Sequence, residues 1–202
     1  SEMCIRDSEW IKNILESVDA SGIALLPMMD CVDLVEEEIV EGMEEIGEED
    51  EEHGFEPEYD EHVWTSPVNT IKISEKISEA VKARLTDEND KSICAQNTEA
   101  FRNELTELDE SFRDVVAKGA RQTIVFGDRF PFRYFADEYG LKYYAAFPGC
   151  SSETEASART ISFLIDKVNE EEIPVVFYPE MSNMKVASTI CESTSAVPMQ
   201  LN

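Results

Sequence analysis

Basic residues are scarce in this 202-residue chain, which has 17 Lys and Arg against 44 Asp and Glu and a formal net charge of −27. A charge of this sign repels polyanions, and the sequence offers no local basic patch that would override the repulsion. Nucleic acid is therefore excluded as a partner. Hydrophobic residues make up 42% of the chain, which is typical of a globular protein with a buried core.

Long apolar runs are also lacking. No stretch approaches the roughly 20 residues that a membrane span needs, and no charged segment followed by an apolar one opens the chain. The five cysteines, at positions 4, 31, 94, 150 and 191, include no CxxC pair and no spacing typical of a disulfide framework. Cysteine usage therefore does not indicate the redox compartment.

The first part of the chain combines an α/β pattern with a strongly charged segment. Residues 9–31 predict a short amphipathic helix followed by a strand-like apolar run, "GIALLPMMDC". Between Asp33 and His62 there is no Lys or Arg. Residues 44–58 are too charged to bury much apolar surface, so we expect a mobile acidic loop there.

Two helices and then an α/β region follow the acidic segment. Ser66 and Pro67 predict a helix start, and the apolar spacing after them predicts a helix over 67–84. Residues 88–118 contain no Pro or Gly and predict a second helix, about 45 Å long at 1.5 Å per residue, that can bridge two lobes. Beyond Gly119, apolar strands alternate with helices, which predicts a parallel sheet covered on both faces. The final "AVPMQLN" stops where a further strand would begin.

Three residues are candidates for binding chemistry. In a parallel sheet, ligands bind at the carboxyl ends of the strands. Asp128 ends the strand-like "TIVFGD", where it is either a ligand or part of an ion pair with Arg129. Cys150 follows the next strand, where we expect a helix to start with Ser151 or Ser152 as its cap. At a helix start the thiolate of Cys150 would be a metal ligand or a nucleophile. The alternative is that Cys150 is an inert core residue.

His62 is one of only two histidines and stands directly before the first predicted long helix. It is either a surface group at the helix entry or a metal ligand, with Asp60 and Glu61 raising the local cation concentration. The other histidine, His53, lies within the acidic run, where we interpret it as part of a solvated charged segment.

The order of these segments resembles the zinc and manganese substrate-binding lipoproteins of bacterial ABC transporters. The resemblance covers about residues 9–195, and its most specific parts are "DEHVWTSPVN" and "FRYFADEYGL". It implies an α/β fold with two parallel-sheet lobes joined by one long helix, and no enzymatic activity. Residues 9–84 would be the C-terminal part of an incomplete first lobe, which includes an acidic metal loop at about 44–60. Residues 88–118 would be the linking helix. Residues 119–202 would be a truncated second lobe.

The resemblance also implies a function and a ligand set. His62 matches the family's second metal histidine, Asp128 lies one residue from the next ligand position, which Arg129 occupies, and Cys150 falls near the third. The first and last family ligands would lie outside this chain, as would the signal and lipid anchor. We therefore expect this chain to bind Zn²⁺ weakly, with Mn²⁺ as the alternative metal. The resemblance implies a monomeric extracytoplasmic protein, either periplasmic or at the cell surface. It would deliver the metal to a membrane permease.

Two other functions are compatible with the same residues. A degenerate family member that binds no metal would act as a surface adhesion or interaction module, because the cation of Arg129 repels a metal ion. A cysteine-dependent hydrolase would use Cys150 as nucleophile and His62 as base. Substitution of Cys150 separates the hydrolase from the carrier, and substitution of His62 separates the carrier from the adhesion module.

Overall fold

The computed structural model describes residues 13–14, 16–17, 22–43, 59–151 and 155–201. The chain divides into two compact units. Unit 1 comprises Ser1–Leu34 and Glu61–Lys118, and unit 2 comprises Val35–Asp60 and Gly119–Asn202. The chain therefore passes from one unit to the other three times.

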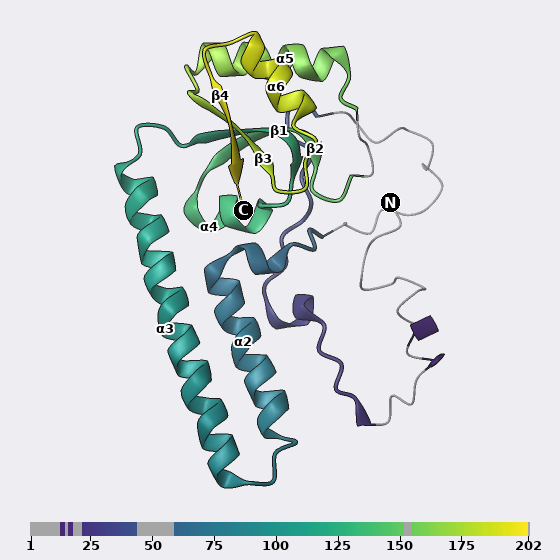
Figure 1. Cartoon of the computed structure of the whole chain (residues 1–202), viewed down its shortest axis with the longest axis vertical. Coiled ribbons are helices and arrows are strands. Elements are labelled where there is room, and N and C mark those ends of the chain that lie inside the picture. The colour runs from purple at the N-terminus through teal and green to yellow at the C-terminus, as the bar shows by residue number, and fades with distance from the viewer. Residues whose placement is uncertain (1–12, 15, 18–21, 44–58, 152–154, 202) are drawn as a thin grey trace. The chain divides into compact units, whose positions relative to one another are not determined.

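Figure 1 labels the helices and strands. In chain order the described elements are two short 3-10 helices, Met28–Cys31 and Val63–Thr65, followed by α2 (Pro67–Lys82), α3 (Glu88–Lys118), β1 (Thr123–Phe130), α4 (Arg133–Tyr139), β2 (Lys142–Pro148), α5 (Ala158–Glu170), β3 (Val175–Pro179), α6 (Lys185–Glu192) and β4 (Val197–Leu201). The short helix predicted near residues 9–18 lies largely outside the described residues, and the acidic loop predicted at 44–58 lies wholly outside them.

Helices α2 and α3 pack along each other in unit 1 (Figure 1). Between them, the buried Ser78 hydroxyl accepts a hydrogen bond of 2.8 Å from Thr98 and lies 3.6 Å from the sulfur of Cys94. Helix α3 runs for 31 residues, as its lack of Pro and Gly predicts. The predicted helices at 67–84 and 88–118 are confirmed, while the role of the second as a link between lobes stays a prediction.

The start of α2 follows the predicted signals. The Ser66 hydroxyl accepts the Asn69 N–H at 3.3 Å, and Pro67 occupies the first helical position, where its missing N–H costs nothing. Ser66 is 1% exposed, so water does not replace its contact. This capping contact fixes the point at which the segment after His62 becomes helical.

Ser66→Ala is expected to lower the free energy of unfolding by about 1 kcal/mol, because the buried Asn69 N–H loses its acceptor. Denaturant unfolding followed by circular dichroism measures the change. Ser74→Ala is the matched control, since Ser74 lies inside the same helix and its hydroxyl donates to the Ile71 carbonyl at 2.8 Å instead of capping a free N–H. Equal effects of the two substitutions would contradict the capping role.

The strand-like run predicted at 22–31 is wrong. Residues 28–31 form a 3-10 helix, and residues 23–27 form no strand in the described part of the chain. Ile23 and Leu25 are 50% and 61% exposed, so the apolar run is not buried there either. A strand needs a neighbouring strand to satisfy its backbone, and Pro27 lacks the N–H that such pairing uses.

Unit 2 contains a four-stranded sheet with the order β2-β1-β3-β4, in which all neighbours are parallel. The predicted α/β class with a parallel sheet is confirmed. The final residues, where a further strand was expected only to begin, already form β4 beside β3. The existence of a second sheet-containing lobe stays a prediction, because the described residues of unit 1 contain no named strand.

Both faces of the sheet are covered, as the sequence predicts. One buried cluster joins Val125 and Val176 of the strands to Leu164 of α5 and Ile190 of α6. The cluster on the other face joins strand residues, among them Phe126, to Ala136 of α4 and to Met43 from the first part of unit 2. Figure 1 shows α5 and α6 on one side of the sheet and α4 on the other.

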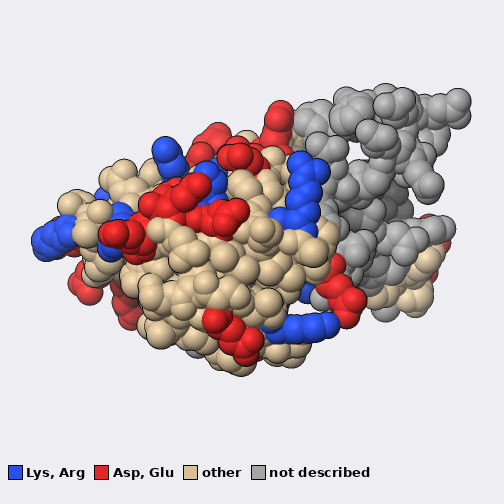
Figure 2. Space-filling model, turned by 90° about the horizontal axis from the view of Figure 1, so that it is seen from above, with Lys and Arg blue, Asp and Glu red and all other residues tan. Residues whose placement is uncertain are grey.

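The surface carries charges of both signs side by side. Figure 2 shows Asp and Glu side chains next to Lys and Arg on the drawn face. The described surface includes ion pairs such as Lys167 with Glu170 at 3.3 Å and Lys185 with Glu155 at 3.0 Å. In the described ranges, no helix is both long and apolar enough to cross a membrane.

Candidate functional site

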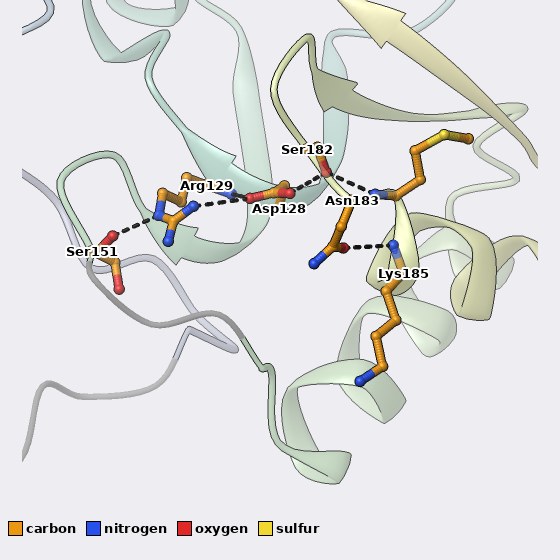
Figure 3. Close-up of polar contacts among 7 residues, drawn as sticks. Asp128, Arg129, Ser151, Ser182, Asn183 and Lys185 are labelled. Carbon is orange, nitrogen blue, oxygen red and sulfur yellow. Dashed lines mark hydrogen bonds and ion pairs between the residues drawn. The ribbon is translucent and has the colours of Figure 1, made fainter.

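Asp128 lies near the carboxyl end of β1, where the pairing of β1 with β2 is irregular between Phe126 and Arg129. Such irregularities re-aim side chains at the ends of strands. The Asp128 carboxylate accepts the Arg129 N–H at 2.7 Å on one oxygen and the Ser182 hydroxyl on the other (Figure 3). Its side chain is 14% exposed. The carboxylate is therefore held in one orientation by the two ends of neighbouring strands.

Arg129 connects this carboxylate to the turn after β2. Its guanidinium lies 3.8 Å from the Asp128 carboxylate, and its Nε donates to the Ser151 carbonyl at 2.5 Å (Figure 3). The ion pair that sequence reasoning left open for Asp128 thus exists. It does not use the whole carboxylate, which offers about four lone-pair positions, so the ligand role of Asp128 stays a prediction.

Sequence reasoning missed Ser182, which orients Asp128. Ser182 follows β3, and its hydroxyl also accepts the Met184 N–H at 3.0 Å, while the Asn183 side chain accepts the Lys185 N–H at 2.9 Å (Figure 3). These contacts shape the β3–α6 turn, in which Met184 has a left-handed φ of 59°. The sequence contained a signal for Ser182, because it lies in a polar turn after the third strand. In a parallel sheet, such a turn falls at the same edge as Asp128.

A hollow of about 200 Å³ opens beside Asp128. It is lined by Asp128, Arg129, Phe147, Met181, Ser182, Asn183 and Val186. These residues come from the carboxyl ends of β1 and β2, the turn after β3 and the first turn of α6, and ligands bind at this edge in open parallel sheets. The hollow is therefore the part of unit 2 in which a small ligand of Asp128 fits.

Cys150 lies in the turn after β2 and is partly buried. Its N–H donates to the Glu37 carboxylate at 3.2 Å. The expectation that it stands at a helix start is wrong, because α5 begins at Ala158, where the Ser157 hydroxyl accepts the Thr160 N–H at 3.1 Å. The cap of α5 is therefore Ser157, and Cys150 lies several residues before the helix. The role of Cys150 as a metal ligand stays a prediction, and it depends on the affinity of the thiolate sulfur for the metal.

His62 stands at the entry of the 3-10 helix Val63–Thr65 in unit 1. Its carbonyl accepts both the N–H and the hydroxyl of Thr65, at 3.1 and 2.8 Å. Its ring centre is 5.6 Å from that of Trp64, with the ring planes at 57°. The next residue, Val63, is fully buried and anchors the turn. The backbone of His62 thus serves the helix entry, and its imidazole is the group that a metal would use.

The predicted ligands are divided between the two units. His62 belongs to unit 1, and Asp128 and Cys150 belong to unit 2, where they flank the contact of Arg129 with Ser151. Among the described residues, no group of three or more His, Cys, Asp or Glu side chains is arranged to hold a metal ion. The three-ligand site therefore stays a prediction.

The chain matches the family described as "Zinc-uptake complex component A periplasmic" over residues 6–202. It belongs to this family. The zinc-binding lipoprotein AdcA of Streptococcus pneumoniae is 28% identical over 194 residues, which are 96% of this chain and 37% of AdcA. The manganese-binding lipoprotein MntA of Halalkalibacterium halodurans is 26% identical over 185 residues, which are 90% of this chain and 54% of MntA. The chain thus spans between about a third and about half of these relatives.

Solved structures agree with the assignment. The laminin-binding protein Lbp of Streptococcus pyogenes is similar with a TM-score of 0.63 and 29% identity, covering 71% of this chain and 55% of Lbp. The metal-dependent lipoprotein YcdH of Bacillus subtilis is similar with a TM-score of 0.60 and 28% identity, covering 71% of this chain and 53% of YcdH. The predicted family and α/β fold are thereby confirmed.

Membership of the zinc-uptake family decides between the classes of function that the sequence left open. The proteins of this family are metal-binding substrate-binding proteins and not enzymes, so the chain is not an enzyme. The hydrolase with Cys150 as nucleophile has no support among these relatives. The degenerate member without metal has no support among the curated relatives AdcA and MntA, which are named for the zinc or manganese that they bind. Lbp, by contrast, is named for laminin binding.

Proposed function

We propose that this chain is part of an extracytoplasmic lipoprotein that captures Zn²⁺, or alternatively Mn²⁺, and delivers it to the permease of an ABC transporter. It does so as a monomer, without making or breaking a covalent bond. The observation that carries the proposal is the family match over residues 6–202, combined with relatives named as zinc-binding and manganese-binding lipoproteins.

The net charge supports a cation as cargo. A formal charge of −27 raises the local concentration of divalent cations and speeds their encounter with the protein. The same charge repels anionic ligands. The field of the chain thus favours the kind of ligand that the relatives are named for.

His62, Asp128 and Cys150 are the proposed ligands. Imidazole and thiolate suit Zn²⁺, whereas imidazole with carboxylates alone also suits Mn²⁺, so the participation of Cys150 decides the metal preference. Three groups are one fewer than a closed tetrahedral zinc site requires. We therefore expect this chain to bind zinc more weakly than a site with four protein ligands.

His62→Ala is expected to weaken zinc binding by about 100-fold, since removing a direct ligand costs at least as much as disturbing the groups around it. Isothermal titration of Zn²⁺ into metal-free protein measures the change. His53→Ala is the matched control, because it removes the other histidine of the chain from the acidic segment. We expect zinc affinity to be unchanged in this control.

The same titration separates the proposal from its competitors. Equal losses in the two histidine variants would assign the metal to unspecific capture by acidic side chains. No heat of binding in the unsubstituted chain would remove the capture function altogether. Titration of Cys150→Ala and Asp128→Asn with Zn²⁺ and Mn²⁺ then assigns the ligands of unit 2: loss of zinc binding with retention of manganese binding is expected for Cys150.

A further inference from the structure

Two segments of unit 2 lead to and from the acidic run, and they are paired. The first stem, residues 35–43, precedes the run, and the second stem, residues 59–60, follows it. Glu36 and Tyr59 form an antiparallel bridge, and the Asp60 N–H donates to the Val35 carbonyl at 3.0 Å. The two stems therefore lie side by side in unit 2 at Val35–Glu36 and Tyr59–Asp60.

A single hydroxyl on α4 joins the two stems. The Tyr134 hydroxyl accepts the Val35 N–H at 3.2 Å and donates to the Asp60 carbonyl at 2.9 Å. Tyr134 is 3% exposed, so water does not replace these bonds. Burial raises the pKa of Tyr134, and the hydroxyl therefore keeps the proton that it donates at neutral pH. One side chain thus satisfies a donor on the first stem and an acceptor on the second.

The first stem is tied to the same unit by further contacts. The Glu37 carboxylate accepts the Cys150 N–H at 3.2 Å, and the Glu38 carboxylate lies 3.4 Å from the Arg133 guanidinium. Met43 is buried against Phe126 and its neighbours. The second stem is held through its backbone, which is bonded to Val35 and to Tyr134. The hydroxyl of Tyr134 is therefore a side-chain contact that holds the second stem.

The second stem is the segment that leads to His62, which follows Asp60 by two residues. Asp60 itself is 1% exposed and does not move without disturbing the interior of unit 2. Its carbonyl, held by Tyr134, is thus a fixed point two residues before the proposed metal ligand. A shift of about 1 Å in a ligand is enough to impair a binding site.

We propose that Tyr134 is a positioning residue for metal binding, which holds the chain at Asp60 and thereby sets where the segment bearing His62 leaves unit 2. Tyr134 does not touch the metal in this proposal. The predicted effect on metal affinity rests on the proposed function. The predicted change in the environment of the His62 side chain can be measured without metal.

The test compares Tyr134→Phe with Tyr139→Phe. Both substitutions remove the hydroxyl of a buried tyrosine of α4 and keep the ring, but only the first breaks the bonds to Val35 and Asp60. We expect Tyr134→Phe to weaken zinc binding by about tenfold, the lower end of what loss of a supporting contact costs, and Tyr139→Phe to leave it within about twofold. In a His53→Gln background, His62 gives the only imidazole proton signals, and these are expected to shift or broaden in Tyr134→Phe alone.

Each outcome decides the proposal. If the unsubstituted chain binds zinc and Tyr134→Phe binds it equally well, the positioning role is refuted. If both tyrosine variants lower affinity and stability by the same amount, Tyr134 is only a core residue. If the unsubstituted chain binds no zinc, the proposed function fails by itself. The imidazole signals of His62 then decide: a change confined to Tyr134→Phe supports the positioning role, and unchanged signals refute it.

Discussion

Phe126→Ala is expected to lower the free energy of unfolding by about 3–5 kcal/mol, which is a large share of the stability of an ordinary domain. Phe126 is fully buried in β1, the strand that pairs with both β2 and β3. Its ring contacts Phe130 edge-on at a centroid distance of 5.0 Å and lies 5.5 Å from Phe132 and 5.7 Å from Phe177. Truncation therefore leaves a cavity lined by rings that cannot all move to fill it.

Denaturant unfolding followed by fluorescence measures this effect, and Phe101→Ala is the matched control. Phe101 is 43% exposed on α3, so its truncation removes the same atoms without opening a buried cavity. We expect a change of less than about 1 kcal/mol for the control. A loss below about 2 kcal/mol for Phe126→Ala would mean that the aromatic cluster collapses around the gap.

Gly127→Ala is expected to have the second large effect, a loss of about 3 kcal/mol. A Cβ atom at Gly127 would lie 2.4 Å from the Cα atom and 2.6 Å from the backbone nitrogen of Ala187 in α6. These are backbone atoms, so relief requires that the helix move away from the sheet. Because the next residue is Asp128, the same displacement disturbs its contact with Ser182.

The matched control is Gly22→Ala, since a Cβ atom at Gly22 meets no other atom within 4 Å. We expect the control to change the free energy of unfolding by no more than about 0.5 kcal/mol. Urea titration of both variants gives the comparison. Equal stability of the two variants would show that α6 does not approach β1 as closely as the structure indicates.

The sequence predicted those parts of the fold whose signals are local. Ser66 and Pro67 mark the start of α2, because they are adjacent and Ser66 caps Asn69 only three residues later. The uninterrupted apolar spacing marks α3. The strand prediction at 22–31 failed because an apolar run carries no information about whether a neighbouring strand exists to pair with it. The helix start predicted after Cys150, with Ser151 or Ser152 as its cap, failed because serine is common at helix starts and in turns alike, and the structure caps α5 with Ser157 instead.

The parts of the candidate site that were missed depend on contacts between distant residues. Ser182 reaches Asp128 over 54 positions, and Tyr134 reaches Val35 over 99 and Asp60 over 74. A single sequence can place Ser182 and Asp128 at the same edge of the sheet, but it does not reveal which distant side chains bond to each other. For the same reason the sequence placed residues 35–43 and 59–60 with the first lobe, whereas these described residues cluster with the sheet of unit 2.

This division of the chain has a consequence for the order of folding. Helices α2 and α3 are adjacent in sequence and can form during synthesis as soon as Lys118 has emerged, whereas the Val35–Asp60 part of unit 2 must wait for strands that begin at Thr123. Contacts of high sequence separation close long loops and slow folding. Until they form, Met43 and the apolar face that it covers are exposed to water together. The sheet unit is therefore expected to fold last, with the helical hairpin already formed between its two parts.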